Sequence, residues 1–205
     1  MARKVRKTPQ ARREEITNAT ARLVSEKGYN GITLKDVADA VGMSQPGVLH
    51  YAGSKEGLLS LIVTEVYAVY GTPEEFLTTG LPGSDPASPH FPAYLRYLVK
   101  HNVSQPELVQ LFMVLQAESF DPSHPLHDYF KFRAERVWKH YSQTHWKLPE
   151  GMDWKRDMKP YVRMSLEAMD GIQLRWLREP PMDYLKEWSA FERAIYPSPT
   201  WDLYR

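Results

Sequence analysis

The segment at residues 31–62, GITLKDVADAVGMSQPGVLHYAGSKEGLLSLI, narrows the possible folds of this chain more than any other stretch. Thr33 is a suitable N-cap for a helix over residues 34–41, because its hydroxyl can accept a hydrogen bond from a free N–H group of the first turn. Gly42 supplies the positive φ with which many helices end. Ser44 is then placed to cap a second short helix. The pattern predicts two short helices joined by a tight turn.

Each of these short helices has one side suited to burial. Val37, Ala38 and Val41 recur at helical spacing, so the first helix has an apolar stripe. In the second helix we expect Val48 and Leu49 to point inward. The remaining side chains then form an outward face: Gln45, Gly47, His50 and Tyr51. Such an arrangement is a helix-turn-helix, with which many proteins read DNA.

Apolar residues recur at helical spacing along most of the chain, and no segment shows sustained period-two alternation. The glycine- and proline-rich residues 71–92 are expected to form a loop with a helical fragment at 74–78. Helices are predicted at residues 10–27, from 54 toward 70, at 94–101, from 106 to about 118, at 126–141, at 162–176 and at 184–195. The expected fold is all-α, with an N-terminal three-helix helix-turn-helix domain and a larger helical domain.

Charged residues are unevenly distributed, although the formal net charge of the chain is only +1. A run of basic residues precedes the first acidic residue, Glu14: Arg3, Lys4, Arg6, Lys7, Arg12 and Arg13. A basic arm beside a helix-turn-helix suits contact with DNA phosphates better than binding to a membrane. A solvated tail without a partner is the other interpretation of this arm.

Composition also bears on where the protein works. The chain has no cysteine, which fits a reducing compartment. No apolar leader follows the basic N-terminus, and the longest strongly apolar stretch, residues 58–63, is far too short to span a bilayer. We therefore expect a cytoplasmic protein without a membrane partner.

Catalytic and metal-binding motifs are weak. His124 and His127 are three residues apart, and His127 with Asp128 forms a doublet of the kind found in metal phosphohydrolases. No further histidine or aspartate partners stand at a convincing spacing. The sequence has no G-x-S-x-G, no P-loop and no G-x-G-x-x-G. We expect no enzyme activity, no metal and no cofactor.

The segment at residues 31–62 resembles the DNA-binding domain of TetR-family transcriptional regulators, through the signature T-L-x-D-V-A-x-A-V-G-x-S-Q-P-x-V-L-H-Y-x-x-S-K-E-x-L-L. The resemblance implies that Gln45 reads an adenine edge in the major groove and that Tyr51 and Lys55 contact phosphates. Leu49 and Ala52 depart from the family pattern at positions where aromatic residues are usual. The implied DNA-binding set is Thr33, Ser44, Gln45, Pro46, Gly47, His50, Tyr51 and Lys55, with Arg3, Lys4, Arg6 and Lys7 of the arm.

The same resemblance implies a DNA-binding domain at residues 1–53 and an effector-binding and dimerisation domain at residues 54–205. A small, largely apolar ligand would contact residues of the larger domain: Tyr94, Tyr97, Phe112, Met113, Gln116, Tyr129, Phe130, Trp138, Tyr141, Met164, Met169 and Gln173. The last two helices would form the dimer interface: Ile172, Trp176, Trp188 and Phe191.

The function so implied is that of a homodimeric repressor, which the ligand releases from a palindromic operator. Two plainer interpretations remain open. The apolar residues of the last two helices could form a thick monomer core, and the chain could be a helical ligand-binding or protein-interaction module that does not bind DNA.

Overall fold

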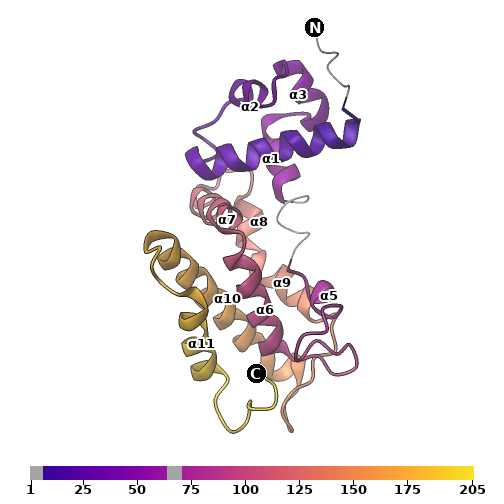
Figure 1. Cartoon of the computed structure of the whole chain (residues 1–205), viewed down its shortest axis with the longest axis vertical. Coiled ribbons are helices and arrows are strands. Elements are labelled where there is room, and N and C mark those ends of the chain that lie inside the picture. Colours follow the sequence, from indigo (N-terminus) through magenta and orange to yellow (C-terminus); the bar gives the residue numbers. More distant parts are fainter. Residues whose placement is uncertain (1–6, 64–70) are drawn as a thin grey trace. The chain divides into compact units, whose positions relative to one another are not determined.

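The computed structural model describes residues 7–63 and 71–205, and these residues form α-helices with one isolated β-bridge, between His90 and Lys147 (Figure 1). The all-α prediction is confirmed. The helices are α1 Pro9–Lys27, α2 Leu34–Val41, α3 Gln45–Ala52, α4 Lys55–Leu61, α5 Pro73–Phe76, α6 Phe91–Val103, α7 Pro106–Glu118, α8 His127–Lys131, α9 Arg133–Tyr141, α10 Trp154–Arg178 and α11 Tyr184–Ile195. Within the described ranges, no helix is both long and apolar enough to cross a membrane.

Side-chain caps start the three short helices α2, α3 and α4. Thr33 forms a capping box with Asp36, in which the Thr33 Oγ1 accepts from the Asp36 N–H at 3.2 Å. The Ser44 Oγ accepts from the Gly47 N–H at 3.2 Å, and the Ser54 Oγ accepts from the Gly57 N–H at 3.0 Å. Between α2 and α3 Gly42 is left-handed, with φ 62° and ψ 40°. The predicted caps and turn are confirmed.

The boundaries of three later helices differ from the prediction. The single helix expected over residues 126–141 is divided into α8 and α9, because Phe132 has φ −98° and ψ 12° and leaves the helical path. Helix α6 begins at Phe91, inside the expected loop, since Pro92 stands in its first turn where no N–H is needed. Helix α10 begins at Trp154, capped by Asp153.

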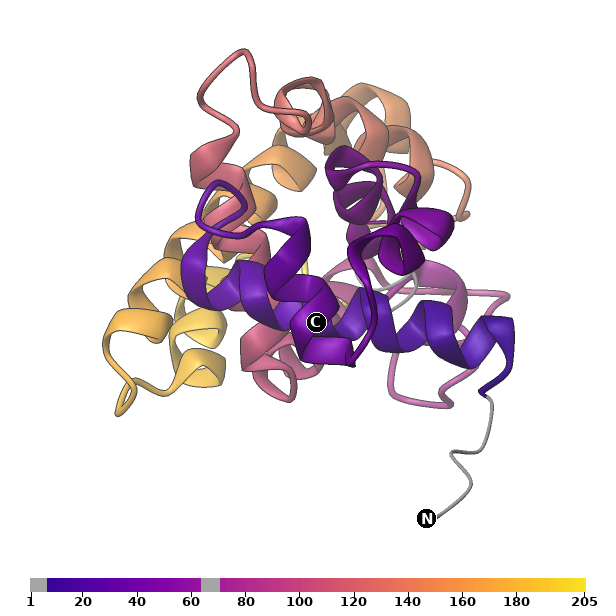
Figure 2. The same ribbon diagram turned by 90° about the horizontal axis from the view of Figure 1, so that it is seen from above.

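The chain divides into two compact units, and their boundary is not the one predicted after residue 53. Within the described ranges, the first unit comprises residues 7–63 and 110–128, and the second comprises 71–109 and 129–205. Helix α4 lies in the first unit because it packs against α1 and α3 (Figure 1, Figure 2). Helix α7 begins in the second unit and ends in the first.

Each unit has its own buried side chains. In the first unit they include a set with little or no exposure: Ile16, Val24, Ile32, Val37, Val48, Leu58 and Leu59. The second unit is rich in buried aromatic rings: Phe76, Phe91, Tyr94, Tyr141, Trp146, Tyr184, Trp188, Tyr196 and Trp201. Helix α11 packs against α6 and α10 in this unit.

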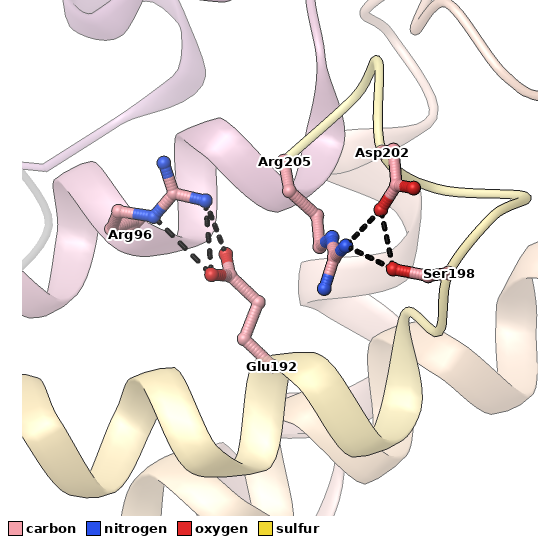
Figure 3. Close-up of polar contacts among 5 residues, drawn as sticks. All are labelled: Arg96, Glu192, Ser198, Asp202 and Arg205. Carbon is pink, nitrogen blue, oxygen red and sulfur yellow. Dashed lines mark hydrogen bonds and ion pairs between the residues drawn. The ribbon is translucent and has the colours of Figure 1, made fainter.

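An ion pair between Arg96 and the buried Glu192 joins α6 to α11 in the second unit (Figure 3). The Arg96 guanidinium donates to both carboxylate oxygens of Glu192, at 2.9 Å each from Nη2. The Glu192 side chain is 7% exposed and that of Arg96 is 33% exposed. Burial raises the pKa of Glu192, whereas Arg96 works in the opposite direction by stabilising the carboxylate. Arg96 therefore offsets part of the unfavourable effect of burial on the charged form of Glu192.

Replacing Arg96 by methionine keeps the aliphatic stem and leaves the Glu192 carboxylate buried without its cation. At pH 7 we expect a loss of about 2 kcal/mol, below the ~3–5 kcal/mol of fully buried pairs because Arg96 is partly exposed. We expect the pKa of Glu192 to rise further in Arg96→Met, so the loss shrinks as the pH falls through that raised pKa and the buried carboxylate of the variant becomes protonated.

Urea unfolding at pH 7 and pH 5 measures this difference, with Arg178→Met as the control at the exposed end of α10, since Arg178 does not affect the pKa of Glu192. An Arg96→Met penalty that is the same at both pH values would mean that Glu192 does not depend on Arg96.

Candidate nucleic-acid interface

The exposed face of α3 is polar, and its opposite side anchors the helix. Gln45 and His50 are exposed, whereas Val48 is fully buried and Leu49 is half-buried. Burial of Val48 fixes the rotation of α3 about its axis. The Gln45 amide therefore points away from the core, as the sequence predicted, and can meet the edge of a base.

The two capping hydroxyls of this region differ in whether they still have a free proton to donate in a hydrogen bond. The Thr33 hydroxyl donates to the Asp36 carboxylate at 2.6 Å, and these bonds lower the pKa of Asp36. The Ser44 hydroxyl acts as an acceptor from Gly47, and that bond leaves its own proton uncommitted. Ser44 can thus cap α3 and donate to a phosphate at once, whereas Thr33 would first have to leave Asp36.

Three residues of the predicted DNA-binding set contact aromatic rings. The Lys55 Nζ lies 4.3 Å from the centroid of the Tyr29 ring. The rings of His50 and Tyr51 meet edge to face, 5.3 Å apart. Tyr51 and Lys55 are half-buried, so their positions are restricted before any ligand binds.

Tyr29 is a residue that the sequence reasoning missed. Its backbone N–H donates to the Glu118 carboxylate at 2.7 Å, and its ring meets the ring of His124 edge to face at 5.3 Å. Burial raises the pKa of Tyr29 to about 12, and the Glu56 carboxylate, which accepts a hydrogen bond from its hydroxyl, adds to the rise. Tyr29 follows Gly28, the residue that caps the C-terminus of α1. This place in the sequence was the only indication that Tyr29 has a structural role.

The basic arm is described only in part, since Arg3, Lys4 and Arg6 lie outside the described residues. Lys7 pairs with Glu15 at 2.8 Å, and Arg12 pairs with the same carboxylate at 2.7 Å. The hydrogen bond from Lys7 is the main reason that the pKa of Glu15 is lowered. The exposed pair of Lys7 with Glu15 is weak, so a DNA phosphate could replace Glu15 as the partner of Lys7 at little cost.

Several residues predicted to bind a ligand pack against other aromatic rings of the second unit. The hydroxyls of Tyr94 and Tyr141 lie 3.2 Å apart in the core, and the Tyr94 hydroxyl donates to the Gly71 carbonyl at 3.0 Å. Trp138 stacks on Trp154 with an interplanar angle of 1°. These three rings therefore contribute to the core of the second unit.

The rest of the predicted ligand set is divided between the two units. Phe112, Met113 and Gln116 belong to the first unit. The others belong to the second unit, where Met169 and Gln173 are buried and the remainder are half-buried: Tyr97, Tyr129, Phe130 and Met164.

The predicted dimer residues also differ in exposure. Trp188 is 0% exposed within the protomer and packs on Phe191, so it belongs to the core and has no surface to offer a partner. Ile172, Trp176 and Phe191 are half-buried. Leu174, which the prediction omitted, is 41% exposed on α10.

The histidines that invited a metal interpretation are engaged in local bonds. The His124 Nδ1 accepts from the Leu126 N–H at 3.2 Å, and the His127 Nδ1 lies 2.9 Å from the Ser119 carbonyl. Across residues 7–63 and 71–205, no group of three or more histidine, aspartate or glutamate side chains could hold a metal ion. Asp128 is exposed and has no assigned role.

A capped, outward-facing α3 on a buried core defines a DNA-binding helix-turn-helix domain. Residues 16–62 match the family model of bacterial regulatory proteins of the tetR family. Over 55 residues the chain is 40% identical to the HTH-type transcriptional regulator BetI of Burkholderia thailandensis, a match that covers 27% of this chain and 28% of that protein.

Solved structures extend the likeness to the whole fold. A TetR-family transcriptional regulator from Rhodococcus sp. has a TM-score of 0.63 at 18% identity, over 91% of this chain and 97% of its own. Multidrug binding protein EbrR, solved with imidazole, has a TM-score of 0.62 at 18% identity, over 97% of this chain and 99% of its own. The N-terminal helices thus match the tetR family model over residues 16–62, and the fold is similar to that of TetR-family structures.

Truncation of Gln45 and truncation of Lys55 are expected to weaken DNA binding in different ways. Gln45→Ala should weaken binding to a preferred sequence by about 1–3 kcal/mol and leave binding to random DNA unchanged if, as predicted, the amide reads a base. Lys55→Ala should weaken both about equally and lower the salt slope by about one if, as predicted, the ammonium meets a phosphate.

Fluorescence anisotropy at several salt concentrations measures both effects. Gln143→Ala and Lys155→Ala, at exposed positions of the second unit, are the matched controls. If Gln45→Ala and Lys55→Ala bound as well as the wild type, the assignment of α3 and α4 to the DNA would be wrong.

Proposed function

We propose that this protein is a TetR-family regulator, a homodimeric transcriptional repressor that acts in the cytoplasm without catalysis. It binds a palindromic operator and leaves it when a small, largely apolar ligand binds. The observation that carries the proposal is the exposed amide of Gln45 on α3, a helix whose opposite side is fixed by the buried Val48.

Two observations support dimerisation: the geometry that DNA binding requires and the surface of the last two helices. Two copies of α3 about 34 Å apart would fit successive major grooves on one side of a palindrome. The chain leaves apolar surface on α10 at Leu174, with Ile172 and Trp176 half-buried on the same helix and Phe191 half-buried on α11. An isologous contact between two copies of these helices would cover that surface.

Release by a ligand is supported by the similarity to EbrR, which is described as a multidrug binding protein. A ligand of this chain need favour the conformation that does not bind DNA by only about 1–3 kcal/mol to lower operator affinity by one or two orders of magnitude. The half-buried aromatic and methionine side chains of the second unit suit a small apolar molecule.

Selection of DNA from random duplexes tests the proposal as a whole. We expect the purified protein to enrich a palindrome whose half-sites are about one helical turn apart, as two α3 helices require. Enrichment of a single half-site would contradict the dimer. No enrichment at all would favour a helical ligand-binding or protein-interaction module without DNA binding.

A charge placed on the apolar surface of α10 should break the dimer. Leu174→Glu would bury a carboxylate between the two copies, so we expect a monomer at micromolar concentration and at least a tenfold loss of operator affinity. Light scattering and anisotropy measure the two effects. Leu203→Glu, at a leucine that is 82% exposed outside α10 and α11, is the matched control. A Leu174→Glu protein that stayed dimeric would exclude this interface.

A further inference from the structure

The last residue of α7 holds the turn that follows α1. The Glu118 carboxylate accepts from the Tyr29 N–H at 2.7 Å and from the Asn30 N–H at 3.4 Å. Gly28 has φ +72°, and a Cβ at this position would lie 2.5 Å from the Glu118 Oε1. The carboxylate thus sits directly against the backbone of the turn. An acceptor bonded to two consecutive N–H groups fixes the path of the backbone there.

The ring of Tyr29 extends from this turn to the start of α4. It is 5% exposed, contacts the His124 ring at its side and carries the Lys55 ammonium over its face, 4.3 Å from the centroid. Its hydroxyl bonds to Glu56, the neighbour of Lys55 in sequence. The position of Lys55 therefore depends on where the ring of Tyr29 lies, and the ring depends on the backbone that Glu118 holds.

We propose that Glu118 is a positioning residue for DNA binding: it fixes the turn after α1, and Tyr29 in turn presents the Lys55 ammonium to a phosphate. The inference rests on the proposed function, since it assumes that Lys55 contacts DNA. An ammonium over an aromatic face keeps N–H groups on its outer side, where an anion can accept from them.

A second contact between α7 and α1 serves as a control, because it distinguishes the positioning role of Glu118 from ordinary packing of these helices. The Gln110 amide donates to the Ser25 carbonyl at 3.0 Å, and this bond likewise joins α7 to α1. It does not involve the turn, Tyr29 or Lys55. Loss of the Gln110 bond therefore measures what a general loosening of α7 against α1 does to DNA binding.

A double-mutant cycle between Lys55 and Glu118 tests the proposal on the full-length protein. The probes are the palindrome selected above and a random duplex of the same length, measured by anisotropy over a series of salt concentrations. In the wild-type background, Lys55→Ala should lower affinity about tenfold and the salt slope by about one. In Glu118→Ala or Tyr29→Leu, the slope should already be lower by about one, and Lys55→Ala should change affinity less than about threefold.

Conservative and control variants complete the experiment. Tyr29→Phe keeps the ring and Glu118→Gln keeps an acceptor oxygen, so both should retain most of the Lys55 effect. Gln110→Ala should retain all of it. Thermal unfolding is recorded for every variant, and the slope is read only from proteins that are folded at the assay temperature. The slope reports the number of phosphate contacts and is not moved by a mere loss of stability.

The possible outcomes separate the two proposals. If Lys55→Ala has no effect in the wild-type background, the DNA contact assumed in the proposed function is wrong. If Lys55→Ala costs about tenfold in every background, Lys55 binds DNA but Glu118 and Tyr29 do not position it, and the further inference is overturned. If Lys55→Ala also had no effect on affinity in the Gln110→Ala background, general packing of α7 against α1 would explain the result. The further inference would then be overturned too.

Discussion

Side-chain capping is the interaction on which the DNA-reading part of this protein depends. Helices as short as α2 and α3 are not stable on their own in water, because few internal hydrogen bonds compensate for the loss of backbone freedom. Thr33 and Ser44 supply acceptors for N–H groups that have no partner in the first turn. With the burial of Val48, this is sufficient to hold Gln45 outward on a fixed helix.

Local chemistry also explains how much of the fold the sequence could predict. Caps and turn glycines act over three or four residues, so the positions of α2 and α3 followed directly from Thr33, Gly42 and Ser44. The bond from Tyr29 to Glu118 spans 89 residues, and no local pattern indicates it. The break at Phe132 was missed for a related reason, since the apolar spacing continues across it and only the backbone angles leave the helix.

The second unit shows why aromatic residues were difficult to assign. An apolar spacing predicts burial, but a ring buried against a neighbouring ring and a ring beside a bound ligand give the same pattern. Tyr94, Tyr141 and Trp138 proved to pack with other rings, and Trp188 is buried inside the protomer. The ion pair of Arg96 with Glu192, from helices far apart in sequence, could not be inferred from either helix alone.

The participation of α7 in the first unit has a consequence for how this protein can be divided. Residues 110–128 group with the helix-turn-helix, and Leu111, Phe112 and Leu115 are buried side chains of that stretch. An N-terminal fragment that stops after α4 would therefore lack part of its own unit, including the carboxylate beside Gly28. The DNA-reading portion is discontinuous in sequence, so it is not a module that could be transplanted as one uninterrupted piece.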